Sequence, residues 1–427
     1  MLGIFLGLLI IIVLAYMGWS IIWVAPIAAG VVALTGGLDL LEAYTGPYME
    51  GFVDFAKTWF PVFMLGAVFG KLMDATGMAN SVAINITKLI GTKRAILGVV
   101  IAGGVLTYGG VSLFVAVFAL YPLAISLFRE ANIPRRLIPG TVALGAFTFT
   151  MTAIPGTPQI QNLIPMEYFG TTPTAAPAMG IVAALIMFLG GYNYLIFREK
   201  KLKAAGEYFD EPTDDVEEDR DVKLPNIFLS IAPLVAVLVG LNIFELHIIT
   251  SLIIGILLIL IFNITKYKRF VGAINDGALG SITAIINTCA AVGFGTVVKS
   301  VEGFNDLTSL LTGIKGSPLI SEAIAINILA GATGSASGGM AIALEALGDY
   351  FVEMSENTGV PLEAFHRIAS LSSGGLDVLP HNGAVLTVLA VTGMTHKKSY
   401  TDIAMVAIVI PVIAIVAVIL LNIIGIV

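Results

Sequence analysis

The chain has 427 residues, of which 57% are hydrophobic and 12% charged, with a formal net charge of −7 and a mean hydropathy of +0.95. This composition excludes a soluble globular protein and indicates a polytopic membrane protein. A single cysteine, Cys289, excludes a disulfide framework, and the sparse basic residues exclude a nucleic-acid interface.

In chain order, the first apolar run covers residues 2–19. Its sequence has no basic residue before the apolar stretch and no small-residue cleavage site, so it predicts a spanning helix rather than a signal peptide. A bilayer core needs roughly 20 apolar residues per helix, and several later runs exceed that length. The later runs cover 21–36, 58–76, 94–128, 137–153, 175–197, 225–243, 244–264, 278–299, 317–352, 364–394 and 401–427.

One long polar stretch, residues 198–223, divides the chain nearly in half and is typical of a solvated linker. The two halves share features at an offset of about 226 residues, which indicates an internal repeat. We predict a first repeat over 1–200, a cytoplasmic linker over 201–223 and a second repeat over 224–427. The matching features are Gly109–Gly110 with Gly338–Gly339, Pro134 with Pro361, and Pro155 with Pro380.

Loop charge predicts how the repeats are oriented, because short basic loops mark the cytoplasmic side. Loop 38–57 is mostly acidic, whereas its counterpart at 266–269 reads KYKR. Loop 128–136 is basic, whereas its counterpart, 349–363, is acidic. Unless chance composition explains both sign changes, the second repeat is inserted upside down, as in many secondary transporters. Both termini are then expected outside the cytoplasm, in a prokaryotic plasma (inner) membrane.

Two runs, 94–128 and 317–352, must enter and leave the membrane on the same side for this topology to close. Each could be a pair of full-length helices or a re-entrant hairpin. Small residues cluster in the middle of each run, as GGVLTYGG at 103–110 and GATGSASGG at 331–339. They favour the hairpin, because non-helical backbone at membrane depth persists only where protein or a water-filled cavity covers it.

Four polar breaks follow from this pattern. The hairpin tips are expected at 107–112 and 333–339, and interrupted helices over 137–165 and 364–394 break at 150–159 and 372–383. A half-helix that starts at mid-membrane presents N–H groups suited to an anion, and one that ends there presents carbonyls suited to a cation. The breaks therefore predict a binding site.

Three ionisable side chains in these segments are candidates for proton coupling, because such groups are costly inside a membrane. Asp377 could carry a proton or cap the following half-helix, and His381 could titrate near neutral pH or satisfy loose carbonyls. Glu345 could relay protons, pair with a hydroxyl or face an aqueous vestibule. The four histidines have no metal-binding spacing, and no phosphate-binding loop of an ATP-driven pump occurs in the sequence.

The motifs FTFTMTAIPGTPQIQNLIP (147–165) and GGLDVLPHNGAVLTVLAVTGMTHKKSYTDI (374–403) resemble the gluconate:proton symporter (gluconate permease) family of the ion transporter superfamily. The resemblance implies an all-α polytopic membrane fold of two inverted-topology repeats. Each repeat would hold about five transmembrane helices, one re-entrant hairpin and one interrupted helix. It further implies separate scaffold and transport domains, a homodimer formed through the scaffold, and elevator-type alternating access.

The resemblance also implies a secondary active transporter for proton-coupled symport of small organic carboxylates such as gluconate, with no catalytic residue, metal or cofactor. The breaks hold few amides or charges, which favours a shorter hydroxy acid such as 3-hydroxybutyrate or lactate. A sodium-coupled carboxylate symporter is the alternative, and an anion channel or a membrane-embedded enzyme is the third hypothesis. No arginine falls in a break, so we expect backbone N–H groups and hydroxyls to hold the carboxylate.

The residues predicted to bind substrate are those at the four breaks. They are Thr107, Tyr108, Gly109, Gly110, Thr152, Pro155, Gly156, Thr157, Thr333, Ser335, Ser337, Gly338, Ser373, His381 and Asn382. Further polar side chains at the same depth are Ser112, Gln159 and Ser372. Hydroxyls in membrane helices often bond only to their own backbone, so each of these could instead have a purely structural role.

Overall fold

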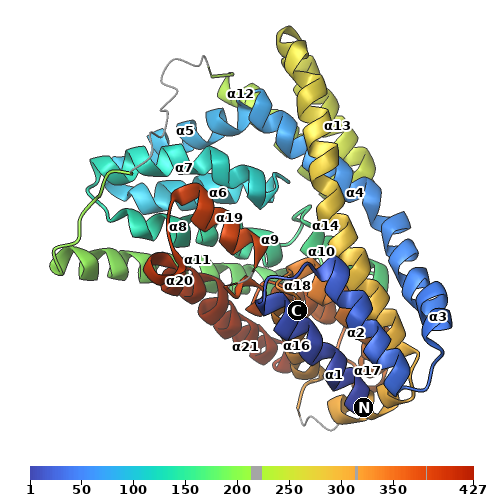
Figure 1. Ribbon diagram of the computed structural model, residues 1–427. Helices are drawn as coiled ribbons and strands as arrows, with labels where there is room; N and C mark the ends of the chain where they lie inside the picture. Colours follow the sequence, from blue (N-terminus) through green and yellow to red (C-terminus); the bar gives the residue numbers. More distant parts are fainter. Residues whose placement is uncertain (213–223, 313–315, 381) are drawn as a thin grey trace.

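A computed structural model describes residues 1–212, 224–312, 316–380 and 382–427 (Figure 1). Within these ranges all regular structure is helical. Linker residues 213–223 and the candidate His381 lie outside the described residues.

The first half of the chain begins with two apolar helices and a long one, and ends with another long helix. Its helices are α1 (Leu2–Tyr16), α2 (Ile21–Thr35), α3 (Leu40–Ala43), α4 (Met49–Ala75), α5 (Met78–Ile90), α6 (Ala95–Tyr108), α7 (Leu113–Glu130), α8 (Ile138–Ala146), α9 (Phe149–Thr152), α10 (Ile160–Phe169) and α11 (Pro177–Ala204).

The second half has a similar order of helices. They are α12 (Ile227–Asn242), α13 (Ile248–Phe262), α14 (Phe270–Lys299), α15 (Gly303–Thr312), α16 (Pro318–Thr333), α17 (Ala336–Thr358), α18 (Leu362–Ser373), the short 3-10 helix η5 (Leu376–Val378), α19 (Gly383–Thr392), α20 (His396–Ala404) and α21 (Ile410–Ile423). The long helices α4 and α14 pack side by side along one side of the molecule (Figure 1).

Five helical stretches of the described residues are long and apolar enough to cross a membrane, or six if the bent pair formed by α18 and α19 counts as one span. Three of them start earlier than the apolar runs predict, at Leu40, Ile264 and His396. Residues from Leu40 onward are helical although 38–57 was expected to be a loop, and residues 264–269 form a 3-10 turn that leads into α14. Hydropathy sets only the apolar part of a span, and a helix can continue into water with charged residues such as Glu50 in its first turn.

The runs 94–128 and 317–352 each fold into two helices that pack against each other, α6 with α7 and α16 with α17. The entering arms have 14 and 16 residues, or about 21 and 24 Å at 1.5 Å per residue. These lengths fall short of a hydrocarbon core of about 30 Å. The leaving arms are longer, with 18 residues in α7 and 23 in α17, and α7 is itself one of the five long apolar stretches, so re-entrant hairpins stay a prediction.

The hairpin turns are narrower than predicted. They occupy 109–112 and 334–335, because Gly110 (φ +97°) and Gly334 (φ +61°) reverse the chain within a few residues. Thr107, Tyr108 and Thr333 thus end helices, whereas Ser337 and Gly338 lie in the first turn of α17.

The predicted match of Gly338–Gly339 with Gly109–Gly110 is wrong in structural terms. Gly109 and Gly110 form a turn, whereas Gly338 and Gly339 are helical. A Cβ at Gly339 would collide with the backbone of Ala330, so this glycine allows the close approach of α16 and α17. A glycine that lets two helices pack closely and a glycine that lets the chain turn cannot be told apart in the sequence.

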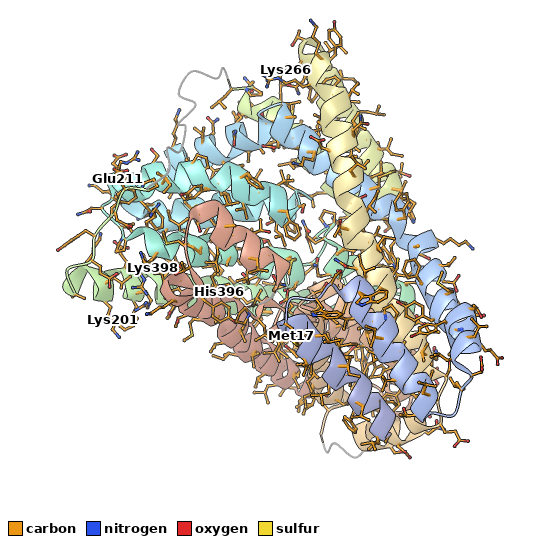
Figure 2. The ribbon with its side chains drawn as sticks, viewed as in Figure 1. Met17, Lys201, Glu211, Lys266, His396 and Lys398 are labelled. Carbon is orange, nitrogen blue, oxygen red and sulfur yellow. The ribbon has the colours of Figure 1, made fainter. Side chains whose placement is uncertain are left out.

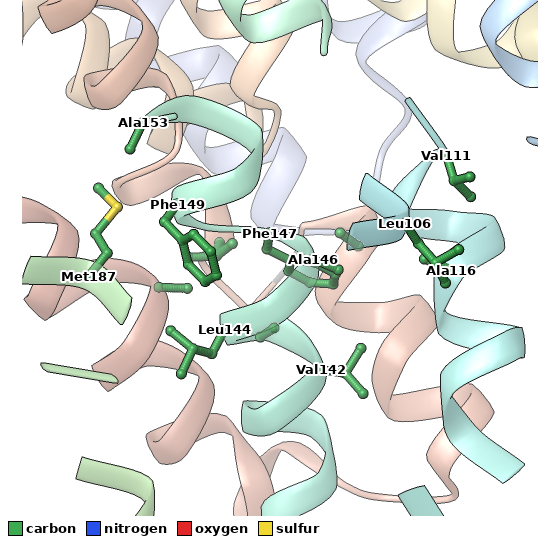
Figure 3. Packing of buried hydrophobic residues seen from close by; sticks show 14 of the residues in the cluster. Leu106, Val111, Ala116, Val142, Leu144, Ala146, Phe147, Phe149, Ala153 and Met187 are labelled. Carbon is green, nitrogen blue, oxygen red and sulfur yellow. The ribbon is translucent and has the colours of Figure 1, made fainter. Parts of the chain in front are cut away.

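Both interrupted helices break within the predicted ranges, but over fewer residues, and the first also breaks at 147–148, between α8 and α9, outside its predicted range. The first break covers 153–159 between α9 and α10, and the second covers 374–382 between α18 and α19, whose axes differ by 53°. Thr152 and Ser373 therefore end helices. Buried side chains such as Leu106, Leu144 and Phe149 pack around the first hairpin tip and the first break (Figure 3).

Candidate functional site

Each break is tied to a hairpin tip by one side-chain amide. Gln159, directly before α10, donates from Nε2 to the carbonyl of Thr107 at 2.5 Å. Asn382, directly before α19, donates from Nδ2 to the carbonyl of Gly334 at 2.9 Å. Carbonyls at a helix end have no partner within the helix. The Thr107 carbonyl also accepts from the Gly110 N–H at 3.0 Å, so Gln159 is a second donor to it. We call the contacts of Gln159 and Asn382 the amide clamps.

Asn382 has a second role, because its Oδ1 accepts hydrogen bonds from the backbone of Ala384 (2.7 Å) and Val385 (3.0 Å). It is therefore the N-cap of α19 as well as the clamp on Gly334. In this conformation the hydrogen bonds of Asn382 go to the protein itself.

The predicted hydroxyls of the first half are engaged with the protein. Thr107 Oγ1 lies 2.9 Å from Thr150 Oγ1, and Thr157 Oγ1 donates to the Thr150 carbonyl at 3.1 Å. Tyr108 donates to the carbonyl of Pro155 at 3.0 Å, and Gly156 O accepts from the amide of Asn242 at 2.9 Å. Hairpin tip and break therefore form one hydrogen-bonded unit.

The hydroxyls of the second half also bond mainly to backbone. Ser335 caps α17 by accepting from Gly338 N at 3.1 Å, and Thr333 donates to Leu329 O at 2.9 Å. Ser373 donates to Ser370 O at 2.7 Å. Such bonds to neighbouring backbone are the structural alternative considered for each hydroxyl.

Two basic side chains of α18, His366 and Arg367, link the two halves. Arg367 is fully buried and donates to the carbonyls of Thr152 (3.4 Å) and Ala175 (2.7 and 3.2 Å) and to Asn162 Oδ1 (3.0 Å). His366 lies 3.2 Å from the same Asn162 oxygen. Both side chains thus hold the segment that surrounds the first break.

Arg367 is enclosed by neutral oxygens. Among the described residues no carboxylate pairs with it, and the titratable side chains with which it interacts electrostatically are the Tyr108 phenol and the neighbouring His366. The sequence reasoning missed Arg367, because it precedes the second break and binds at the first. A basic pair inside the apolar run 364–394 was the signal that could have found it.

Asp377 lies in η5 within the second break and is 4% exposed. Its Oδ1 has no hydrogen-bond partner among the described residues, and the same holds for the hydroxyl of Ser372. The backbone beside Asp377 is held by Tyr400, which donates to Val378 O at 3.2 Å. The structure therefore places a buried, partly unsatisfied carboxyl at the break where the sequence predicted one.

Glu345 lies away from the breaks. It is nine residues into α17, about 14 Å from the start of the helix along its axis. It accepts a hydrogen bond from Tyr168 at 3.2 Å and lines a cavity of about 400 Å³ together with Glu50, Asp54 and Lys299. Glu345 was expected either to relay protons or to have a structural role, paired with a hydroxyl or facing an aqueous vestibule. The Tyr168 hydroxyl matches the first structural alternative, and the cavity matches the second.

A family model for GntP family permeases matches residues 1–246. The chain belongs to the GntP permease family. The permease is 43% identical over 432 aligned residues to the uncharacterized transporter YxjC of Bacillus subtilis, covering 91% of this chain and 92% of that one. An uncharacterized permease of Haemophilus influenzae is 26% identical over 225 residues, 49% of this chain and 43% of that one.

The permease also resembles a solved structure, the YdaH transporter of Alcanivorax borkumensis, described as having an unusual topology. The TM-score is 0.61 at 13% identity, over 90% of this chain and 88% of that chain, so the likeness concerns the fold alone. The family predicted from residues 147–165 and 374–403 is confirmed, and this permease is a helical membrane transporter.

We expect Asn382→Ala to destabilise the permease more than Asn382→Ser does. Serine keeps a capping oxygen for α19 but loses the amide donor to Gly334, whereas alanine loses both, and loss of a cap costs about 1 kcal/mol. Thermal unfolding in detergent measures this order. Asn193→Ala is the control, because the exposed Asn193 amide bonds only within its own helix. If both Asn382 variants unfolded at the same temperature as the wild type, the proposed role of the Asn382 clamp would be contradicted.

Proposed function

We propose that this permease is a secondary active transporter that couples protons to the symport of small organic carboxylates, either gluconate-type acids or short hydroxy acids such as 3-hydroxybutyrate. The observation that carries the proposal is the buried guanidinium of Arg367, which has no counter-anion among the described residues and lies beside the first break.

A buried cation without an anion favours an anionic ligand. Carbonyl oxygens satisfy the hydrogen bonds of a guanidinium but leave its charge uncompensated in a medium of low dielectric constant. Arg367 uses four of its five N–H groups in the described contacts, which leaves one on Nη2. A carboxylate that enters the first break beside Tyr108 would supply the missing charge. This proposal adds Arg367 to the backbone N–H groups and hydroxyls that the sequence predicts to hold the carboxylate.

Proton coupling is assigned to acids of the second half. Asp377 is the principal carrier in this proposal, because its carboxyl is buried in the second break with one oxygen unsatisfied. Glu345, which faces the cavity, is proposed as a relay between water and the interior. His381, also proposed for coupling and binding, lies outside the described residues.

The proposed mechanism is alternating access by an elevator movement in a homodimer built from two inverted repeats. The order of elements supports the repeat: a long helix, a short helix, a hairpin, an interrupted helix and a final long segment occur in both halves. The hairpins and interrupted helices would form the transport domain, and the long helices α4 and α14 would belong to the scaffold.

The proposed orientation puts both termini outside the cytoplasm, in a plasma membrane. Three segments assigned to the cytoplasm lie together at one end of the molecule (Figure 2). They are the loop with Arg129 and Arg136, the linker segment with Lys201 and Glu211, and the loop with Lys398. Arg129 pairs with Glu211 at 2.9 Å, and Arg136 donates to the Lys398 carbonyl at 2.7 Å. Their contact supports placing them on the same side of the membrane.

The decisive test is uptake of labelled gluconate and 3-hydroxybutyrate into proteoliposomes, each driven separately by an inward proton gradient and an inward sodium gradient. We expect proton-driven accumulation of one of the two acids. Accumulation with sodium alone would favour the sodium-coupled alternative. Conductance of the acid anion without a coupling gradient of protons or sodium would indicate a channel, and chemical conversion of the acid would indicate an enzyme. Absence of accumulation under either gradient would contradict transport of these carboxylates.

We expect Arg367→Gln to lower carboxylate uptake by about 10- to 100-fold, because charge-assisted hydrogen bonds contribute roughly 1.5–3 kcal/mol. Arg367→Lys keeps the charge without the planar fork and should retain more uptake than the glutamine variant. Arg94→Gln, at an exposed position in the loop before α6, is the matched control. Size-exclusion profiles establish that each variant is folded. Equal uptake by the folded wild type and the folded glutamine variant would remove Arg367 from substrate recognition.

Cysteine labelling in cells tests the orientation. In a Cys289→Ala background, Glu356→Cys should react with an impermeant maleimide added outside, and Lys398→Cys only after permeabilisation. Both positions are exposed and the native Cys289 is buried, so membrane side alone sets their reactivity. The reverse labelling pattern would invert the assigned topology.

A further inference from the structure

A second unpartnered acid lies in the entering arm of the second hairpin. Glu322, in the second turn of α16, is 0% exposed, and neither of its carboxyl oxygens has a hydrogen-bond partner among the described residues. The sequence reasoning did not single it out.

Asp402 shows what a purely structural buried acid looks like in this protein. It is also 0% exposed, but it pairs with Arg198 at 2.6 Å and accepts a hydrogen bond from Tyr194 at 2.7 Å. An ionised carboxylate buried without such partners is strongly disfavoured, because it loses its hydration with nothing in exchange. Glu322 fits its surroundings only as the neutral acid, so its protonation is tied to the conformation that buries it.

The elements packed on α16 offer Glu322 no charge. Helices α1 and α21 contain no acidic or basic side chain. On α18, Arg367 and His366 bond towards the first break, and exposed Glu363 occupies the first turn.

The remaining neighbours of α16 form no hydrogen bond with Glu322 among the described residues, and this includes Tyr350 of α17, whose buried hydroxyl has no partner there. On α17, Glu345 faces the cavity and Asp349 pairs with Lys299 at 2.7 Å. The other acids are Asp377 in η5, Asp306 of α15, paired with the amino terminus at 3.6 Å, and the exposed Glu353 and Glu356 near the end of α17. Among the described residues no charged group acts electrostatically on Glu322.

Helix α16 connects Glu322 to the second break at two points. Asn327, five residues further along α16, accepts a hydrogen bond at Oδ1 from the backbone N–H of Leu376 at 3.2 Å. Asp377 is the next residue in the chain. At the far end of α16, Gly334 is held by the Asn382 clamp. A movement of the second hairpin relative to its neighbours would therefore change the burial of Glu322 and the geometry around Asp377 together.

The first hairpin has no equivalent group. Its entering arm, α6, reads AILGVVIAGGVLTY and contains no acid, and none occurs in the break at 153–159. The acid is thus not required by the hairpin architecture itself, because the first hairpin forms with apolar side chains in its entering arm.

We propose that Glu322 is a second proton-binding site of the permease. The carboxylate takes a proton from water on the side of higher proton activity, is buried as the neutral acid in the conformation described here, and returns the proton to water on the opposite side when the hairpin moves. No other reactant is needed. This inference rests on the proposed proton-coupled transport and extends it to a residue outside the four breaks.

The test separates coupling from transport itself. Wild-type, Glu322→Gln and Glu322→Asp permeases are reconstituted in proteoliposomes, with whichever of gluconate and 3-hydroxybutyrate the wild type accumulates. Two rates are measured: proton-driven accumulation, and counterflow of labelled acid against unlabelled acid without a gradient. Glu363→Gln, which removes an exposed acid from α18, is the control.

We expect Glu322→Gln, which mimics the neutral acid, to lose at least tenfold in proton-driven accumulation while counterflow stays within about twofold of the wild type. Glu322→Asp, which can still bind a proton, should recover part of the accumulation. Accumulation by Glu322→Gln within twofold of the wild type would overturn the assignment. Parallel loss of accumulation and counterflow in both variants would also overturn it, in favour of a structural role.

Failure of the proposed function gives a different result. A wild type that accumulates neither acid under a proton gradient would overturn proton coupling, and the Glu322 assignment with it. If the wild type accumulates one of the acids under a proton gradient and Glu322→Gln accumulates it equally well, only the Glu322 assignment is overturned.

Discussion

The need to satisfy backbone polar groups away from water governs this structure. An unbroken helix bonds its own carbonyls and N–H groups, but two hairpin tips and two interrupted helices leave such groups exposed within an apolar protein. The amide clamps meet this need, with Gln159 on the Thr107 carbonyl and Asn382 on the Gly334 carbonyl. Each clamp joins a helix break to a hairpin tip. It therefore brings together two segments whose backbone groups lack partners within a helix.

The same constraint explains why the predicted hydroxyls are occupied. Thr107, Thr157 and Ser335 bond to neighbouring side chains or backbone and thereby shape the breaks. Binding of a substrate would then draw on groups that are already positioned, which reduces the entropy lost on binding. Against this background the ionisable groups without a partner of opposite charge stand out: Arg367 near the first break, and the buried acids Asp377 and Glu322 in the second half.

The sequence reasoning located the four interruptions because they depend on local chemistry. Proline and glycine within an apolar run break a helix wherever the rest of the chain lies, so Pro155, Pro380 and Gly334 were sufficient signals. It set the turn boundaries too wide, since a single glycine with positive φ reverses the chain more sharply than a cluster of small residues suggests. It also matched Gly338–Gly339 to a turn, because a packing glycine and a turn glycine are identical in sequence.

By itself the sequence determined the membrane class, the permease family, the positions of the breaks and the presence of Asp377 in one of them, all of which follow from composition and short motifs. Only the tertiary structure decided what each polar group touches. Arg367 binds carbonyls at Thr152 and Ala175, about two hundred residues earlier in the chain, and Glu345 turns to a cavity instead of a break. Glu322 is unpartnered because neutral surfaces of other helices surround it. Such contacts depend on how helices distant in sequence pack, and local sequence carries no direct record of that packing.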